Sequence, residues 1–232
     1  LKEQLGVRSL DGFGCAGMKH GIAAAGAVVY YLKETQKVNP SHINDLVTYR
    51  LGDYMFLDES SVLNLELFET VRRRSQQGSL FKVLDRTVTP MGGRLLKRWI
   101  AYPLVDMNRI RHRLAAVADF REDRIFREDI REELKGIYDL ERLNGRVSLG
   151  RANARDLEAL KLSIQRLPSV KERLAGSASE LLSDIGRRMD TLRDIAEIIE
   201  KAICDDPPVS LKEGGIIREG YNKELDELIT IS

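Results

Sequence analysis

The chain has 232 residues, of which 43% are hydrophobic, and its 37 Lys and Arg against 36 Asp and Glu give a formal net charge of +1. This composition supplies a hydrophobic core for one large or two modest domains, and the balanced charge excludes a whole-chain field that attracts nucleic acid, so any such contact has to be local. No apolar run approaches the roughly 20 residues that a membrane-spanning helix needs, so we expect no membrane partner.

The N-terminal part predicts a loop, a helix and one short strand. Residues 10–21 are rich in glycine and indicate a loop, whereas the Ala-rich residues 22–37 predict a largely buried helix. The Asn-Pro-Ser stretch at 39–41 interrupts this helix, and the aromatic and apolar residues at 53–57 are typical of a strand. Asp58 is suited to cap the helix that follows.

The segment from Thr89 to Pro103 predicts a helix with defined ends. Thr89 can cap it, Pro90 fits the first helical position, and Pro103 stops it. The larger apolar side chains recur on one face at helical spacing: Met91, Leu95, Trp99 and Tyr102. Gly92 and Gly93 each cost about 1 kcal/mol of helix stability relative to Ala, so we expect a tight contact with another helix there.

Beyond residue 106 the pattern is almost entirely helical. Apolar residues recur at helical spacing between charge-rich runs that suit exposed faces, among them Ile110, Leu114, Val117, Ile130, Leu134, Leu143, Leu157, Leu160, Ile195 and Ile199. The Asp-Asp-Pro-Pro run at 205–208 ends this region, residues 209–218 read as a hairpin around two glycines, and Tyr221 and Asn222 open a last helix. The predicted fold class is therefore mainly α, with minor β at the N- and C-terminal margins.

A phosphate-binding loop of the form Gly-x-x-x-x-Gly-Lys-Ser/Thr does not occur in the sequence. The glycines at 12–17 are followed by Met18, Lys19 and His20, so the lysine comes one place late and the hydroxyl that binds magnesium is lacking. We predict that this chain binds no nucleotide and no other cofactor.

Catalytic and metal-binding patterns are equally lacking. His20, His42 and His112 do not have the helical spacing of a metal site, and no nucleophile stands in a recognisable motif. Cys15 and Cys204 lie far apart and read as thiols in a reducing cytosol. We therefore predict no catalytic residue and no metal ligand.

Two basic clusters are candidates for DNA-backbone contact: Arg72, Arg73 and Arg74, and Arg94, Lys97 and Arg98. Neither is interleaved with enough aromatic residues to form a stacking platform, and nearby acidic residues favour the alternative of solvated charge on helix faces. Trp99, the sole tryptophan, lies on an apolar face, so we expect it to anchor the core.

Three stretches resemble the MutS family of DNA mismatch repair proteins, and they stand in the family's order and at about its spacing. They are Leu-Asp-Gly-Phe-Gly at 10–14 with residues 25–36, the long run at 57–104 that includes Thr-Pro-Met-Gly-Gly-Arg-Leu-Leu-Lys-Arg-Trp, and residues 214–228. The resemblance implies the end of a connector domain over 1–35, a multi-helix core or lever domain over 36–208, and a hairpin with the start of the helix to the clamp over 209–232.

The resemblance implies a non-catalytic scaffold that couples the family's ATPase to mismatch recognition and to the DNA clamp. ATP and magnesium would bind in the ATPase domain, which this chain lacks; the implied partners are mismatched duplex DNA, a MutL-type matchmaker and a second copy in a homodimer, in the cytoplasm. The residues expected to carry the coupling are Thr89, Pro90, Met91, Gly92, Gly93 and Trp99. A chain without the return helix of the core should also expose an apolar stripe.

Two alternatives remain open: a helical module that docks a repair partner such as MutL, and a sequence-independent DNA-backbone-binding module. The family's mismatch reader, a Phe followed two residues later by a Glu, is matched by Phe120 and Glu122 in spacing alone. Because this pair lies in a charged helical run after the core signature, and Phe120 follows Val117 on one face, we expect Phe120 to pack in the core rather than enter a base stack.

Overall fold

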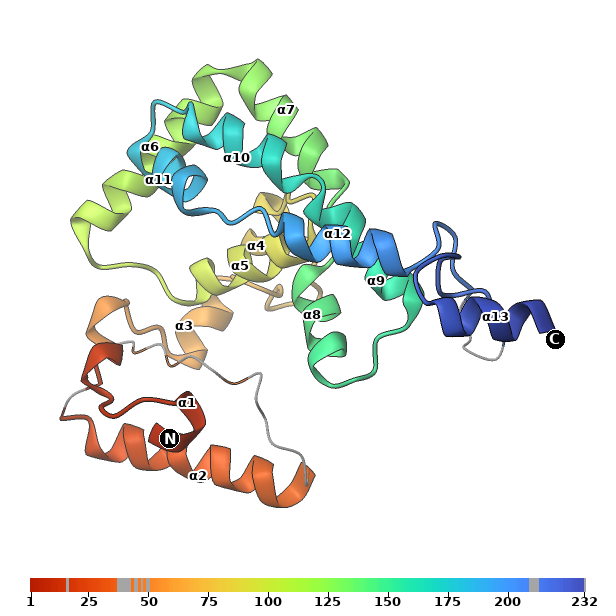
Figure 1. Ribbon diagram of the computed structural model, residues 1–232. Helices are drawn as coiled ribbons and strands as arrows, with labels where there is room; N and C mark the ends of the chain where they lie inside the picture. The colour runs from red at the N-terminus through yellow and green to blue at the C-terminus, as the bar shows by residue number, and fades with distance from the viewer. Residues whose placement is uncertain are drawn as a thin grey trace. The chain divides into compact units, whose positions relative to one another are not determined.

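The computed structural model describes residues 1–15, 17–36, 43, 46, 48, 51–208 and 213–231 (Figure 1). Its backbone contacts divide the chain into two compact units, Leu1–Asp53 and Tyr54–Ser232. The predicted helix break at 39–41 and the first predicted strand of the hairpin, at 209–212, lie outside the described residues.

The first unit contains α1 (Lys2–Leu5), the short 3-10 helix η1 (Asp11–Phe13), α2 (Lys19–Gln36) and the 3-10 turn η2 (Leu51–Asp53). The Gly-rich segment before α2 is a loop, as predicted, and Cys15 is buried there with its thiol donating to the Leu10 carbonyl at 3.3 Å. The prediction that α2 is largely buried is wrong: Val29 is buried, but Tyr30 and Tyr31 are exposed. The small Ala and Val side chains of α2 form no wide apolar stripe, so the described residues of the first unit cover only one side of this helix.

The second unit begins with a single antiparallel bridge between Tyr54 and Leu104, beside which the Met55 amide donates to the Pro103 carbonyl at 2.8 Å. The strand predicted at 53–57 is therefore reduced to one bridge. The predicted cap is confirmed, because Asp58 accepts from the Ser61 amide at 2.6 Å at the start of α3 (Glu59–Asn64). Ser79 caps the next helix, α4 (Leu80–Leu84), in the same way.

Helix α5 (Pro90–Ala101) has the predicted ends. The Thr89 hydroxyl accepts from the Gly92 amide at 3.1 Å, Pro90 occupies the first turn, and the helix ends before Tyr102. Its apolar face, however, is open: Trp99 is 40% exposed, and Leu95 and Tyr102 are also exposed. The prediction of a core anchor at Trp99 is wrong: α5 packs on α4 and, through Met91, on buried residues of the helices that follow, but it buries none of its own residues fully.

Seven helices follow, and they confirm the predicted helical region: α6 (Met107–Glu122), α7 (Arg124–Lys135), α8 (Leu140–Ser148), α9 (Ala154–Ile164), α10 (Leu167–Ala175), α11 (Glu180–Arg188) and α12 (Arg193–Ala202). Four start behind a side-chain cap, from Asp106, Asp123, Asp139 and Asn153. Leu114 and Val117, predicted on an apolar face of α6, are exposed.

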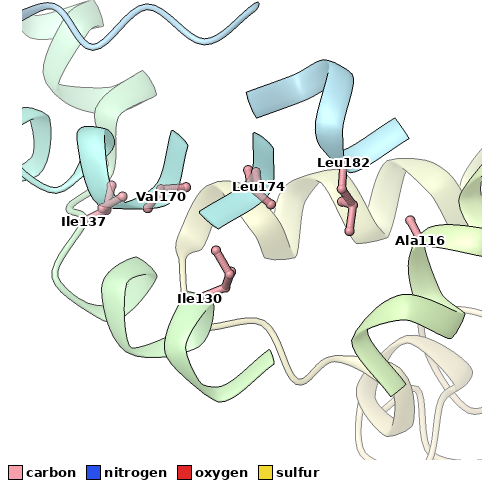
Figure 2. Packing of buried hydrophobic residues seen from close by; sticks show 6 residues of the cluster. All are labelled: Ala116, Ile130, Ile137, Val170, Leu174 and Leu182. Atoms are coloured by element: carbon pink, nitrogen blue, oxygen red, sulfur yellow. The ribbon is translucent and has the colours of Figure 1, made fainter. Parts of the chain in front are cut away.

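The main core lies where α6, α7, α10 and α11 meet. Figure 2 shows the six buried residues of this cluster, Ala116, Ile130, Ile137, Val170, Leu174 and Leu182. A smaller cluster of Ala154, Ile199 and Ile203 joins α9 to α12. Full burial of a Val, Leu or Ile side chain is worth about 1.5–3 kcal/mol, so these two clusters hold the second unit together.

Among the glycines, Gly186 makes the closest approach to a neighbouring helix, between α10 and α11. A Cβ placed on Gly186 would lie 2.5 Å from the Ala175 amide nitrogen and 2.9 Å from the Leu174 carbonyl carbon. The predicted helix–helix contact at Gly92 and Gly93 is wrong, because their neighbours are side chains of the turn before α5, such as Thr87, whose Cβ lies 3.3 Å from a Cβ placed on Gly92.

After α12 the chain folds back, and Ile217 forms an antiparallel bridge with Ile203. The described partner of Ile217 is thus the end of α12, rather than the other arm of the predicted hairpin. The last helix, α13 (Lys223–Ile231), starts as predicted at Asn222, whose side chain accepts from the Glu224 amide at 3.0 Å. Within the described part of the chain, no helix is both long and apolar enough to cross a membrane.

Candidate functional site

The first predicted basic cluster lies on the exposed turn between α3 and α4. Arg74 is tied to the unit, since its guanidinium lies 2.6 Å from the Glu69 carboxylate. Arg72 and Arg73 are exposed and form no ion pair with any residue that the structure describes. The turn therefore presents two free cationic side chains, and DNA-backbone contact there stays a prediction.

The second predicted cluster does not form one patch. The Arg94 guanidinium donates to both carboxylate oxygens of Asp139, at 2.7 and 2.9 Å, and to Glu141 at 2.6 and 2.8 Å. The hydrogen bonds from Arg94 lower the pKa of Asp139 below its ordinary value, and the same bonds raise the pKa of Arg94. Arg94 is thus a tie between α5 and α8, and its charge is already compensated within the unit.

Lys97 turns toward the first cluster instead. Its ammonium lies 5.4 Å from the centre of the Phe68 ring, and together with Arg74 it lines a hollow of about 350 Å³. Apolar and acidic side chains also line this hollow, among them Val62, Leu63, Glu59 and Glu69. The structure thus brings one residue of each predicted cluster together, at a surface of mixed charge.

An aromatic and cationic surface that the sequence did not reveal surrounds Trp99. The guanidinium carbon of Arg113, on α6, lies 3.6 Å from the centre of the Trp99 ring, and the Tyr102 ring packs edge-on against Tyr54. Burial lowers the pKa of Arg113, with a smaller effect in the same direction from Arg109. Arg113 has no ion-pair partner within the described ranges, so its contact with the indole is a cation–π interaction.

Hydrogen bonds tie helices that are distant in sequence. Asp119 of α6 accepts from the Ser177 hydroxyl and, at 3.1 Å, from the Ser179 amide at the start of α11. Arg173 of α10 pairs with Asp129 of α7. With the Arg94 tie, these contacts join α5 to α8, α6 to α11 and α7 to α10.

Phe120 packs as predicted. Its ring stacks on Phe126 with centroids 4.9 Å apart and an angle of 8° between the planes, and both rings lie against the main core. Glu122 is exposed at the end of α6. A wedge that enters a base stack has to be exposed, and this ring is engaged elsewhere.

The described residues contain no group of three or more His, Cys, Asp or Glu side chains that could hold a metal ion. His112 lies 3.9 Å from Glu180, and His42 lies outside the described residues. Cys15 and Cys204 are free thiols. The polar and aromatic side chains that the described structure brings together form hydrogen-bonded ties between helices. They also form two surfaces, one around Lys97 and one around Trp99.

Comparison with known families gives two matches that together span most of the chain. Residues 60–231 match the family model described as MutS domain III, and residues 1–44 match MutS domain II. The structural division after Asp53 falls between these two matches, whereas the boundary predicted at residue 35 lies within the domain II match.

Curated relatives give the same result. The chain is 49% identical over 228 residues to DNA mismatch repair protein MutS of Halothermothrix orenii, covering 98% of the chain and 25% of that relative. It is 50% identical over 211 residues to the Acetivibrio thermocellus protein of the same name, covering 91% and 24%, and 44% identical over 232 residues to that of Symbiobacterium thermophilum, covering 100% and 26%. The chain spans about a quarter of the length of these relatives.

Proposed function

Because the chain belongs to the MutS family of DNA mismatch repair proteins, we propose that it is a non-catalytic helical core, preceded by the end of a connector, within a longer mismatch repair protein. Its role is to couple an ATPase in the full-length protein to mismatch recognition and to a clamp around DNA. ATP and magnesium bind to the ATPase, outside this chain.

The observation that carries this proposal is the set of ties between helices that are distant in sequence. Arg94 joins α5 to α8 through two carboxylates, and Asp119 joins α6 to the start of α11. Transmission of a conformational change requires packed elements with discrete arrangements, rather than a reactive site. Charge-assisted hydrogen bonds between helices hold the packed helices in one such arrangement.

The partners of the full-length protein follow from the family. The relatives are named as DNA mismatch repair proteins, which supports mismatched duplex DNA as the substrate of the full-length protein. A second copy in a homodimer, a MutL-type matchmaker and a cytoplasmic location remain part of the same proposal.

Docking of a protein partner is the second candidate function, and the surface around Trp99 favours it. Trp, Tyr and Arg dominate the residues that carry binding energy at protein interfaces, and here Trp99 and Tyr102 are partly exposed beside Arg113. DNA-backbone contact through Arg72 and Arg73 is the third. The salt dependence of binding distinguishes protein docking from DNA-backbone contact. Affinity for phosphates falls steeply as the salt concentration rises, whereas affinity through apolar groups does not.

The coupling role is tested with Arg94→Gln in the full-length protein. We expect the variant to hydrolyse ATP and bind mismatched DNA but to release DNA more slowly upon ATP addition, because the tie between α5 and α8 is lost. Arg124→Gln is the control, since it removes an ion pair of the same chemistry, 2.7 Å from Glu128, within a single helix. ATP-dependent release at the wild-type rate in Arg94→Gln would contradict the coupling through this tie.

A further inference from the structure

Arg218 lies in the fold-back between α12 and α13, and its side chain binds residues at the end of α12 and just after it. Its Nε donates to the Glu200 carbonyl at 2.8 Å, and its two terminal nitrogens donate to Asp205, Nη2 to Oδ1 at 2.6 Å and Nη1 to Oδ2 at 3.3 Å. Its backbone amide also donates, to the Ala202 carbonyl at 2.9 Å. All the donors named here therefore bind the last turn of α12 or the residues just after it.

This arrangement is more than an exposed ion pair, which alone contributes little to stability. The last carbonyls of a helix have no partner within the helix, and Arg218 satisfies two of them, those of Glu200 and Ala202. The backbone on either side pairs as well, since the Cys204 amide donates to the Ile216 carbonyl at 3.0 Å. The planar guanidinium binds the carboxylate with two parallel bonds, which fixes its orientation.

Asp205 is in turn held by a buried cation. Lys161 of α9 is 4% exposed, and its Nζ lies 3.9 Å from the Asp205 carboxylate and 3.0 Å from that of Glu158. Glu158 is the nearer ion-pair partner of Lys161, and Asp205 is a second carboxylate within ion-pair range of this buried cation. The anchor of Arg218 thus reaches from the surface to a buried lysine of α9.

The path from Arg218 to α13 is short and contains two hydrogen bonds. The Tyr221 amide donates to the Arg218 carbonyl at 3.1 Å, and the Gly220 amide donates to Asp226 of α13 at 3.0 Å. Gly220 has a φ of +84°, which a side chain would strain. Figure 1 shows α13 extending beyond the end of α12.

We propose that Arg218 is a positioning residue that sets the direction in which α13 leaves the helical unit, with Asp205 and Lys161 as its anchor. This latch deepens the proposed function and rests on it for its consequence, since α13 begins the segment that leads toward the clamp in that proposal. Loss of the latch leaves the helical core folded but frees α13.

The latch is tested on the 232-residue chain by amide hydrogen exchange and by the ¹⁵N heteronuclear NOE of α13. In Arg218→Gln we expect the Cys204 amide to exchange about tenfold faster, which corresponds to about 1.4 kcal/mol, and the NOE of α13 to fall. The core amide of Leu174 should exchange as in the wild type. Arg188→Gln is the matched control, because it removes an exposed pair, 3.3 Å from Asp184, inside α11.

Asp205→Asn is a second variant for the case that Arg218→Gln does not fold. It weakens the same latch but keeps the hydrogen bond from Arg218 to the Glu200 carbonyl. Unchanged Cys204 exchange and an unchanged NOE in the folded variants would overturn the latch. A freed α13 together with wild-type ATP-dependent DNA release in the full-length protein would confirm the latch and contradict the proposed coupling. A freed α13 with slowed release supports both.

Discussion

Gly186 is the position where a single added methyl group has the largest expected effect. A Cβ there would lie 2.5 Å from the Ala175 nitrogen, about 0.9 Å inside the 3.4 Å at which ordinary contact begins. Both the nearest atoms belong to the α10 backbone, so no side chain can move aside. To admit the methyl group, α10 and α11 have to separate at the main core.

The magnitude follows from two opposing effects. Ala is a better helix former than Gly by about 1 kcal/mol, which stabilises the variant. Overpacking costs about 1–3 kcal/mol, and a gap of 0.5–1 Å forfeits a quarter to a half of each dispersion contact that it opens, here those of Leu174 and Leu182. Because the approach is to backbone at 2.5 Å, the cost lies at the upper end, about 3 kcal/mol. After the gain of about 1 kcal/mol, we expect a net loss of about 2 kcal/mol in the free energy of unfolding of Gly186→Ala.

The assay is urea unfolding followed by circular dichroism, in which a change of midpoint without a change of slope reports stability alone. Gly145→Ala is the control, because Gly145 lies inside α8 and no atom comes within 4 Å of a Cβ placed there. This control should be more stable by up to about 1 kcal/mol. The reasoning is refuted if Gly186→Ala is as stable as the wild type while Gly145→Ala behaves as expected.

The remaining predictions concern the ties and the core. In Arg94→Gln the pKa of Asp139 rises toward its ordinary value, because the hydrogen bonds that lower it are removed; carbon-detected NMR titration measures this shift, and an unchanged pKa would argue against the tie. Since a lowered folded-state pKa gives stability that is lost as pH falls through that pKa, acid should destabilise the wild type more than Arg94→Gln. Asp119→Ala should cost about 1–2 kcal/mol by urea unfolding, because the Ser177 hydroxyl loses its acceptor and the Ser179 amide at the start of α11 keeps only the Ser177 hydroxyl; a loss below about 0.5 kcal/mol would count against the tie. Phe120→Ala should cost about 3 kcal/mol by the same assay, with Phe120→Leu recovering most of it, and equal losses in both would indicate that volume is not what matters there.

Local signals were read correctly from the sequence. The caps at Asp58 and Thr89 and the first-turn proline at Pro90 depend on residues within three or four positions of one another, so their pattern determines their structure. The core packing of Phe120 agrees with the expectation from its spacing to Val117, although Val117 itself is exposed and the stacking on Phe126 is a contact that the spacing does not predict.

Features that depend on distant segments were misread. Trp99 has the spacing of a core residue, but no described segment covers its exposed edge, and Arg113 reaches it from the next helix. Arg94 has the sequence context of a solvated basic cluster, yet its partners belong to α8. Gly186 stands among charged residues without any pattern that marks a close backbone approach, because the approach is decided by α10.

Fluorescence anisotropy of labelled matched and mismatched duplexes with this chain, at low and at physiological salt, tests the central claim most directly. The account of a coupling scaffold predicts no binding at physiological salt and no preference for the mismatch at either salt. Mismatch-independent binding that falls with salt would assign DNA-backbone contact to Arg72 and Arg73. A clear preference for the mismatched duplex would contradict the account, because the chain would then contain a mismatch reader.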